Sequence, residues 1–305
     1  MLFRSVLHER AEQRLAEEPW LEAALGSFVG ADVLEILARR YDALLDSTVR
    51  RADGVIEART AAMLEPYVDR PGQRGEPNLT PEQLDAFVAA LVRRSFSVHI
   101  HAIGDRAVRL SLDALEAAGA RSGVNGPRHQ LAHIEVIHPA DFPRFRTLGV
   151  IANFQPLWAW ADPYITDLTL PALTPEAARF IYPIRSIEAA GATVAFGSDW
   201  SVSSPNPLAG IQVAVTRRDP DASAAPFLPD ESILLATALE AYTIASAFAL
   251  GLDAETGSIE VGKLADLVVV SHDLFGLAPT KIASARVLLT LVEGEAVYRD
   301  PAFAR

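Results

Sequence analysis

The chain has 305 residues, of which 50% are hydrophobic and 22% are charged. This is the composition of a globular protein, long enough for one large domain and a smaller appendage. The net charge of -12 argues against nucleic acid and anionic membranes as partners, and the absence of cysteine excludes disulfides and thiolate metal sites. The first thirty residues are charged throughout, which fits neither a signal peptide nor a membrane span, so we expect a cytoplasmic protein.

The first fifty residues are predicted to form a helical N-terminal segment. Leucines and Trp20 alternate with glutamates between residues 7 and 45 in a helical pattern. A loop rich in proline and glycine follows at residues 66–78. Thr80, Pro81 and Gln83 then form a helix start, with a capping threonine, proline at the first helical position and a glutamine that closes a capping box.

From residue 96 onward, strand patterns alternate with helix patterns. Strands are predicted at 96–101, 130–134, 150–154 and 193–198, and helices at 105–118, 140–148, 183–190, 207–215 and 230–250. Strands that alternate with helices form parallel βαβ units, so the fold class is α/β. We assign residues 51–252 to this domain. The tail, 253–305, has short β runs at 257–262, 267–271, 287–292 and 296–298, which predicts a small β appendage.

Polar side chains end three of the predicted strands. His99 and His101 share one face of the first strand because side chains alternate with period 2. His133 ends the second strand and Asp199 ends the fourth. The carboxyl ends of neighbouring parallel strands meet on one rim, where two imidazoles and a carboxylate could hold a metal ion that activates water.

Each of these residues also has a structural explanation. A single histidine such as His133 is more often a hydrogen-bonded structural residue, and an aspartate at a helix start, such as Asp105, is more often a helix cap than a catalytic group. Trp158, Trp160 and Trp200 near the rim fit an apolar substrate group, and core or lid packing explains them equally well.

Several segments together resemble the amidohydrolase superfamily, and more narrowly amidohydrolase family 3, the YtcJ-like metal-dependent hydrolases. The matching segments begin at Ala52-Asp53-Gly54, run on to residue 75, and continue at 99–107, 128–133, 196–200, 242–247 and 257–269. The most specific of them are His99-Ile100-His101-Ala102-Ile103-Gly104-Asp105-Arg106-Ala107 and the run from Gly257 to Val269. The resemblance covers the chain from Ala52 to about Tyr298.

This resemblance implies a (β/α)8 TIM-like barrel with a metal site, usually zinc, that hydrolyses amide-like, non-peptide carbon–nitrogen bonds. His101, His133 and Asp199 fall at the family's metal ligands on strands 5, 6 and 8. In such enzymes the strand-8 aspartate also moves the proton of the attacking water. His99, Asp105 and Trp200 are the residues we expect to bind a small-molecule substrate.

Two parts of the family pattern are missing from this sequence. The strand-1 His-x-His pair is absent, and the strand-4 lysine falls at about Val49. Arg50 and Arg51 cannot replace that lysine because guanidinium does not deprotonate to ligate a metal. The sequence therefore predicts an incomplete barrel, the C-terminal part of the fold, with one divalent metal ion, Zn²⁺ or another, on three protein ligands.

Two alternatives remain open. The chain could be a truncated, catalytically impaired amidohydrolase fragment or a non-catalytic subunit. An incomplete barrel also exposes strand edges, so either a homo-oligomer or a partner polypeptide is expected to cover them.

Overall fold

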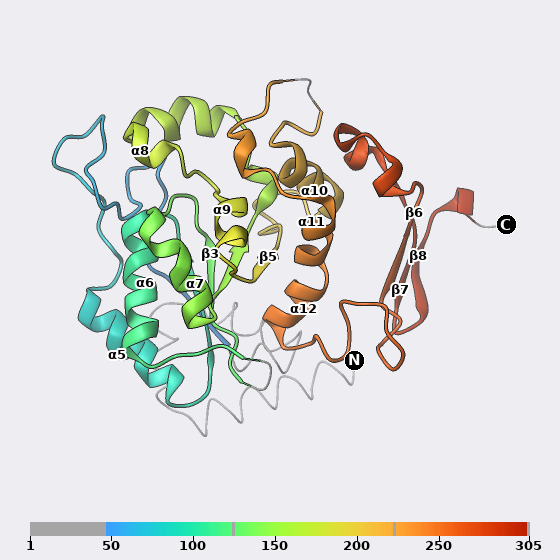
Figure 1. Cartoon of the computed structure of the whole chain (residues 1–305), viewed down its shortest axis with the longest axis horizontal. Helices are drawn as coiled ribbons and strands as arrows, with labels where there is room; N and C mark the ends of the chain where they lie inside the picture. The colour runs from blue at the N-terminus through green and yellow to red at the C-terminus, as the bar shows by residue number, and fades with distance from the viewer. Residues whose placement is uncertain (1–46, 124–125, 222–223, 304–305) are drawn as a thin grey trace.

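The computed structural model describes residues 47–123, 126–221 and 224–303. They form a five-stranded parallel sheet with helices packed around it and a separate three-stranded antiparallel sheet (Figure 1). The helix predicted between residues 7 and 45 lies outside the described residues. Residues 47–50, which belong to the predicted helical segment, instead open the first strand of the parallel sheet.

The parallel sheet has its strands in chain order. Its strands are β1 (Ser47–Arg51), β2 (Ser97–Ala102), β3 (Gln130–His133), β4 (Ile151–Phe154) and β5 (Val194–Phe196). Buried side chains from β3, β4 and β5 face both sides of the sheet, as expected for parallel strands covered by helices. The α/β class is therefore confirmed, and the parallel order is that of a partial barrel.

Helices and short helical turns connect the strands. The α-helices are α5 (Pro81–Val92), α6 (Asp105–Ala117), α7 (Phe142–Leu148), α8 (Pro175–Ala178), α9 (Ile184–Ala189), α10 (Pro207–Thr216), α11 (Leu235–Tyr242) and α12 (Ile244–Leu250). The turns that matter for the site are the 3-10 helices η2 (Pro156–Trp158) and η7 (Pro279–Ser284) and the π-helix η3 (Tyr164–Thr169). No described helix is long and apolar enough to cross a membrane.

The predicted start of α5 is confirmed. The Thr80 hydroxyl accepts a hydrogen bond from the Gln83 backbone N–H, and the Gln83 side chain accepts one from the Thr80 backbone N–H. This reciprocal pair satisfies two donors that the first helical turn would leave free. Leu84, Val88 and Leu91 then lie buried along one face of the helix.

Strand register places His101 and His133 one position apart, near the ends of β2 and β3. His101 pairs with Ala132, and Ala102 pairs with His133. Further along, Phe154 of β4 pairs with Phe196 of β5, three residues before Asp199. Since all five strands run the same way, these side chains follow one rim, as the sequence predicted.

Two predicted elements differ from the structure. The single helix predicted at 230–250 is two helices, α11 and α12, because Thr243 between them has non-helical angles (φ -118°, ψ -96°). The β run predicted at 257–262 is a series of turns, since Gly257 and Gly262 both have left-handed φ angles. Gly257 has no room for a side chain: a Cβ there would lie 2.6 Å from the Ala247 methyl.

The C-terminal appendage is the antiparallel sheet of β6 (Leu267–Val270), β7 (Val287–Val292) and β8 (Glu295–Arg299). It lies to one side of the parallel sheet, beyond α10 and α11 (Figure 1). Helix α10 packs against η7, which precedes β7 and so joins the appendage to the α/β part. Unlike the parallel strands, β8 is exposed along its whole length.

Candidate metal and active site

The centre of the candidate site is a pair of histidines. His101 near the end of β2 and His133 at the end of β3 meet edge to face, with ring centroids 4.6 Å apart. The backbone of His133 and of the next residue, Ile134, is left-handed (φ 75° and 50°), which is uncommon for residues other than glycine. Strained backbone of this kind persists where the surroundings hold it, and it turns His133 toward His101 at the rim.

A chain of side-chain amides fixes the orientation of the His133 ring. Its Nδ1 lies 2.7 Å from Gln155 Oε1, the Gln155 amide donates to Asn153 Oδ1, and the Asn153 amide donates to Gln130 Oε1. Because an amide oxygen only accepts, Nδ1 carries the proton and Nε2 keeps its lone pair. Burial, together with the neighbouring His101, lowers the pKa of His133 to about 4, so the ring is neutral near pH 7.

Asp53 is the most deeply anchored carboxylate at this site. Its two oxygens accept hydrogen bonds from the backbone N–H groups of Ala62, Ile103 and Gly104, at 2.9 to 3.0 Å. This ties the loop after β1 to the residues that follow His101. Asp53 Oδ1 also lies 3.6 Å from His101 Nδ1, which places a fixed negative charge beside the histidine pair.

The histidine pair has the donor chemistry of a metal site. His101 Nδ1 is a buried nitrogen without a hydrogen-bond partner among the described residues, which is costly unless something else binds it. His101 and His133 together offer imidazole nitrogens from neighbouring strands, and imidazole is a preferred ligand of zinc. A divalent ion therefore fits these two residues. Within the described residues no set of three histidine, aspartate or glutamate side chains is arranged to hold one.

Asp199, the third predicted ligand, lies in the exposed loop after β5. Its carboxylate is close enough to favour the charged form of His133, and its backbone is also left-handed (φ 51°). Trp200 beside it is 68% exposed. The structure thus brings His101 and His133 together, with Asp199 near them on the solvent side.

His99 lies two residues before His101 on the same strand and is half-buried. Burial, and then repulsion from the nearby His133 and His101, lowers the pKa of His99 to about 4. The residue is therefore a neutral imidazole at the inner side of the histidine pair, where it can donate or accept a hydrogen bond.

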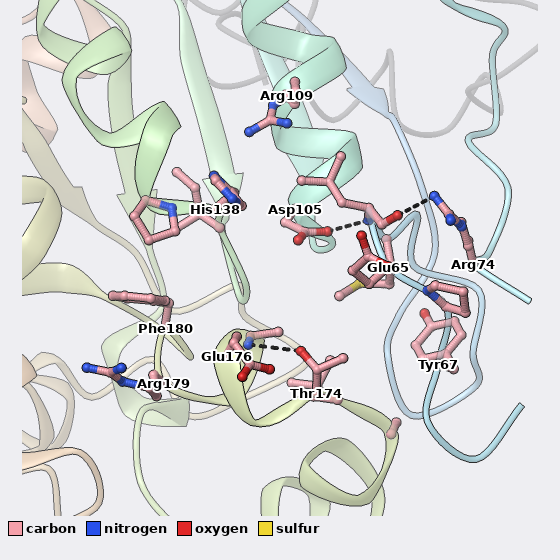
Figure 2. A pocket seen from close by; sticks show the side chains of 18 residues that line it. Glu65, Tyr67, Arg74, Asp105, Arg109, His138, Thr174, Glu176, Arg179 and Phe180 are labelled. Atoms are coloured by element: carbon pink, nitrogen blue, oxygen red, sulfur yellow. Dashed lines mark hydrogen bonds between the residues drawn. The ribbon is translucent and has the colours of Figure 1, made fainter. Parts of the chain in front are cut away.

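Asp105 lines a separate cavity of about 690 Å³ that contains none of the predicted metal ligands (Figure 2). Its Oδ1 accepts a hydrogen bond from the Leu64 backbone N–H at 2.7 Å, and burial raises the pKa of the Asp105 carboxyl. Two arginines on the cavity wall are already engaged: Arg109 binds Asp141, and Arg74 donates to the Leu64 carbonyl. Through its hydrogen bond to the Leu64 backbone N–H, Asp105 in the first turn of α6 holds the Leu64 loop against that helix.

Two glutamates, the half-buried Glu57 and the buried Glu135, lie just beyond His133. The Thr169 hydroxyl is 3.1 Å from Glu57 Oε1 and 3.4 Å from Glu135 Oε1, so it donates between two carboxyl groups. Burial, and then repulsion from Glu57, raises the pKa of Glu135 well above its ordinary value. Glu135, two residues from His133, therefore keeps its proton to a higher pH than an ordinary glutamate does.

Sequence reasoning gave no role to Asp53, Gln155 or Glu135. Asp53 stands in the matched Ala52-Asp53-Gly54 segment, which was the available signal. Gln155 directly follows the buried end of β4, the same strand-end position that identified His133 on β3. Trp158 was noted near the rim, but its ring stacks on His133 with centroids 5.7 Å apart and planes 12° from parallel.

Comparison with known proteins agrees with this architecture. The sequence pattern of the Amidohydrolase family matches residues 15–298. The protein LONG AFTER FAR-RED 3 of Arabidopsis thaliana is 36% identical over 247 residues, which cover 81% of this chain and 42% of the relative. The N-substituted formamide deformylase of Arthrobacter pascens is 30% identical over 201 residues, 65% of this chain and 36% of the relative.

A solved structure has the same fold. The uncharacterized metal-dependent hydrolase from Pyrococcus furiosus superposes with a TM-score of 0.60 at 25% identity, covering 71% of this chain and 42% of that one. The chain spans less than half the length of these two curated relatives. The match to the family pattern covers most of the chain, including the histidine pair and Asp199, and on this basis the protein belongs to the amidohydrolase family.

Proposed function

We propose that this protein is a metal-dependent hydrolase of non-peptide, amide-like carbon–nitrogen bonds. The observation that carries the proposal is the His101–His133 pair, with a buried nitrogen that makes no hydrogen bond on one ring and a free Nε2 on the other. His101 and His133 would hold one divalent ion, zinc or another, and Asp199 on the solvent side is the third ligand that we propose, although its carboxylate is not within ligating reach of the pair in this structure. The ion, when bound, would supply Lewis-acid chemistry and lower the pKa of water.

The chain's own residues supply the remaining chemistry. The Asp199 carboxylate, exposed at the rim, takes a proton from the attacking water and delivers it to the leaving amine nitrogen. Gln155 holds the His133 ring in the tautomer that leaves Nε2 free. Trp158 covers one face of His133, and we propose His99 and Trp200 as the residues that would orient a substrate. The deformylase relative supports substrates of the substituted-formamide type.

Metal content and turnover of the purified chain test this proposal together. We expect about one zinc per chain, measured by mass spectrometry of the metal, and amine release from an N-substituted formamide. His101→Ala and His133→Ala should each remove the metal and lower kcat/KM by about 100-fold or more. His272→Ala, an exposed histidine in the appendage, is the matched control and should change neither. Unchanged zinc content in both the His101→Ala and the His133→Ala variants would overturn the proposal.

The edge strands of the parallel sheet favour a partner that covers them, which is compatible with the proposed activity. Among the described residues β1 pairs only with β2, and β5 pairs only with β4, so each presents an unpaired edge. We propose that a second copy or another polypeptide covers these edges. If neither covers them, the alternative applies that the chain is an impaired fragment or a non-catalytic subunit. Light scattering of the chain, alone and mixed with the product of a neighbouring gene, tests this. A stable, active monomer would contradict it.

A further inference from the structure

A second cavity, of about 460 Å³, lies at the rim between the segment after β4 and the segments around α10. Its lining combines two tryptophans with three aspartates and contains no lysine or arginine: the residues that carry the argument are Trp158, Trp160, Asp162, Asp219 and Asp221. This is a volume of the size that small-molecule sites occupy.

The cavity adjoins the histidine pair through one side chain. Trp158 lines the cavity and also stacks on the ring of His133. A molecule in the cavity would therefore lie directly beside the proposed reaction centre, separated from His133 by the indole. This makes the cavity a subsite for the part of a substrate that does not react.

The walls of the cavity are fixed by buried hydrogen bonds. The buried Gln212 of α10 donates its amide N–H to the Pro220 carbonyl at 2.9 Å and accepts a hydrogen bond from the Ala283 backbone N–H at 2.8 Å. Pro220 and Ala283 both line the cavity. One side chain thus joins the loop after α10 to η7, so the cavity is preformed.

The three aspartates lack a positive partner within the described part of the chain. None of them forms an ion pair there, whereas the buried Asp141 is paired with both Arg109 and Arg144. Asp162 and Asp219 instead accept backbone N–H groups, from Ile165 at 2.8 Å and Asp221 at 3.0 Å. Burial raises the pKa of Asp162, as expected for a carboxyl group removed from water without a counter-charge.

We infer that this cavity binds a small organic cation, such as a quaternary or protonated alkylammonium group. Indole faces attract ammonium groups through their quadrupole, and the carboxylates attract them by charge, Asp162 and Asp219 from half-buried positions and Asp221 from an exposed one. An anionic group would meet three carboxylates and no cation. The inference rests on the proposed function, because it assigns the cationic group to the substrate of the same site.

Choline and its uncharged analogue 3,3-dimethylbutan-1-ol provide the test. Each is titrated into the ¹⁵N-labelled full chain while the indole N–H signals are followed. We expect choline to shift the signals of Trp158 and Trp160 but not of Trp200, which does not line the cavity. The alcohol should bind about tenfold more weakly, since it has the same shape without the charge.

Variants distinguish binding in the cavity from a nonspecific attraction of choline to the negative charge of the protein. Trp160→Leu and the nearly isosteric Asp219→Asn should each weaken choline binding by about fivefold or more. Asp85→Asn, on the exposed side of α5, removes the same charge elsewhere and should leave binding unchanged. Equal binding of the alcohol, or wild-type binding by Asp219→Asn, would overturn the inference.

The same titration keeps the two proposals apart. His101→Ala should abolish hydrolysis and leave the choline response intact. Metal-dependent hydrolysis without any preference for choline over the alcohol would overturn this inference alone. Choline binding in a chain that neither holds zinc nor hydrolyses formamides would overturn the proposed function alone.

Discussion

The two sheets of this protein are stabilised in different ways. In the parallel sheet, the side chains of β3 and β5 are buried on both faces, and the rim is held by buried polar groups such as Asp53. In the antiparallel appendage, β8 is exposed throughout, and Val268 and Val297 are 58% and 62% exposed. The polar chemistry gathers where burial is deepest, because only a rigid, dry frame holds imidazoles and carboxylates in fixed positions.

The largest expected difference between the two regions concerns aspartates that bind backbone N–H groups. Asp53 is buried and accepts three such hydrogen bonds, whereas the exposed Asp266 of the appendage accepts one, from Glu293. Asp53→Ala should lower the free energy of unfolding by about 3–5 kcal/mol, and Asp266→Ala by less than about 1 kcal/mol. Urea unfolding measures both, and equal losses would contradict the comparison.

Acid should destabilise the α/β part through buried histidines. Burial lowers the pKa of His129 to about 4, and its Nδ1 accepts a hydrogen bond from the Val98 backbone N–H. The unfolded chain binds the proton more tightly, so this contribution is complete above about pH 6.5 and is lost as the pH falls toward 4.

His129→Asn keeps an acceptor for Val98 and removes the titration. Its stability should therefore fall less than that of the wild type between pH 6.5 and 4, by a difference of about 3 kcal/mol. His272→Asn, at an exposed position in the appendage, is the control. Parallel pH curves for wild type and His129→Asn would show that His129 does not titrate in this range.

The same substitution in the two sheets tests packing directly. Val98 of β2 is fully buried and Val297 of β8 is 62% exposed. Val98→Ala should cost about 2–3 kcal/mol, from lost burial and the cavity left behind, and Val297→Ala within about 0.5 kcal/mol of zero. Thermal and urea unfolding followed by circular dichroism give both values. A large cost at Val297 would mean that the appendage face is covered.

The smallest difference concerns local hydrogen bonds. Thr80→Ala removes the N-cap of α5 and should cost about 1 kcal/mol. Glu260→Gln, in the exposed contact with Lys263 and Ser258, should leave stability unchanged within error because solvent screens that pair. Urea unfolding midpoints of the two variants measure both effects. A larger loss of stability for Glu260→Gln than for Thr80→Ala would contradict the distinction between the capped helix and the exposed turn.

Much of the α/β part could be predicted from the sequence because its signals are local. The capping box at Thr80 and the period of α6 depend on residues within a few positions of each other. The rim position of His101 and His133 followed from strand polarity alone. The break at Thr243 and the turns around Gly257 were not predicted, because each depends on contacts with residues outside its own window.

The details of the site depend on long-range geometry. Asp53 is about fifty positions from the backbone N–H groups of Ile103 and Gly104 that it binds, and Thr169 bridges Glu57 to Glu135 across the fold. No periodicity or spacing connects such residues. The family resemblance identified the ligand-type residues, which share motif positions, but not the amides and carboxylates that orient them.

The stacking of Trp158 on His133 has a practical consequence. The emission of an indole depends on the charge of the group against its face, and the pKa of this buried imidazole lies near 4. Trp158 is thus a built-in optical sensor of the centre, able to report protonation of His133, or occupation of its Nε2, in unlabelled protein. Its fluorescence, read against a Trp158→Phe variant, would follow the site in real time without a substrate.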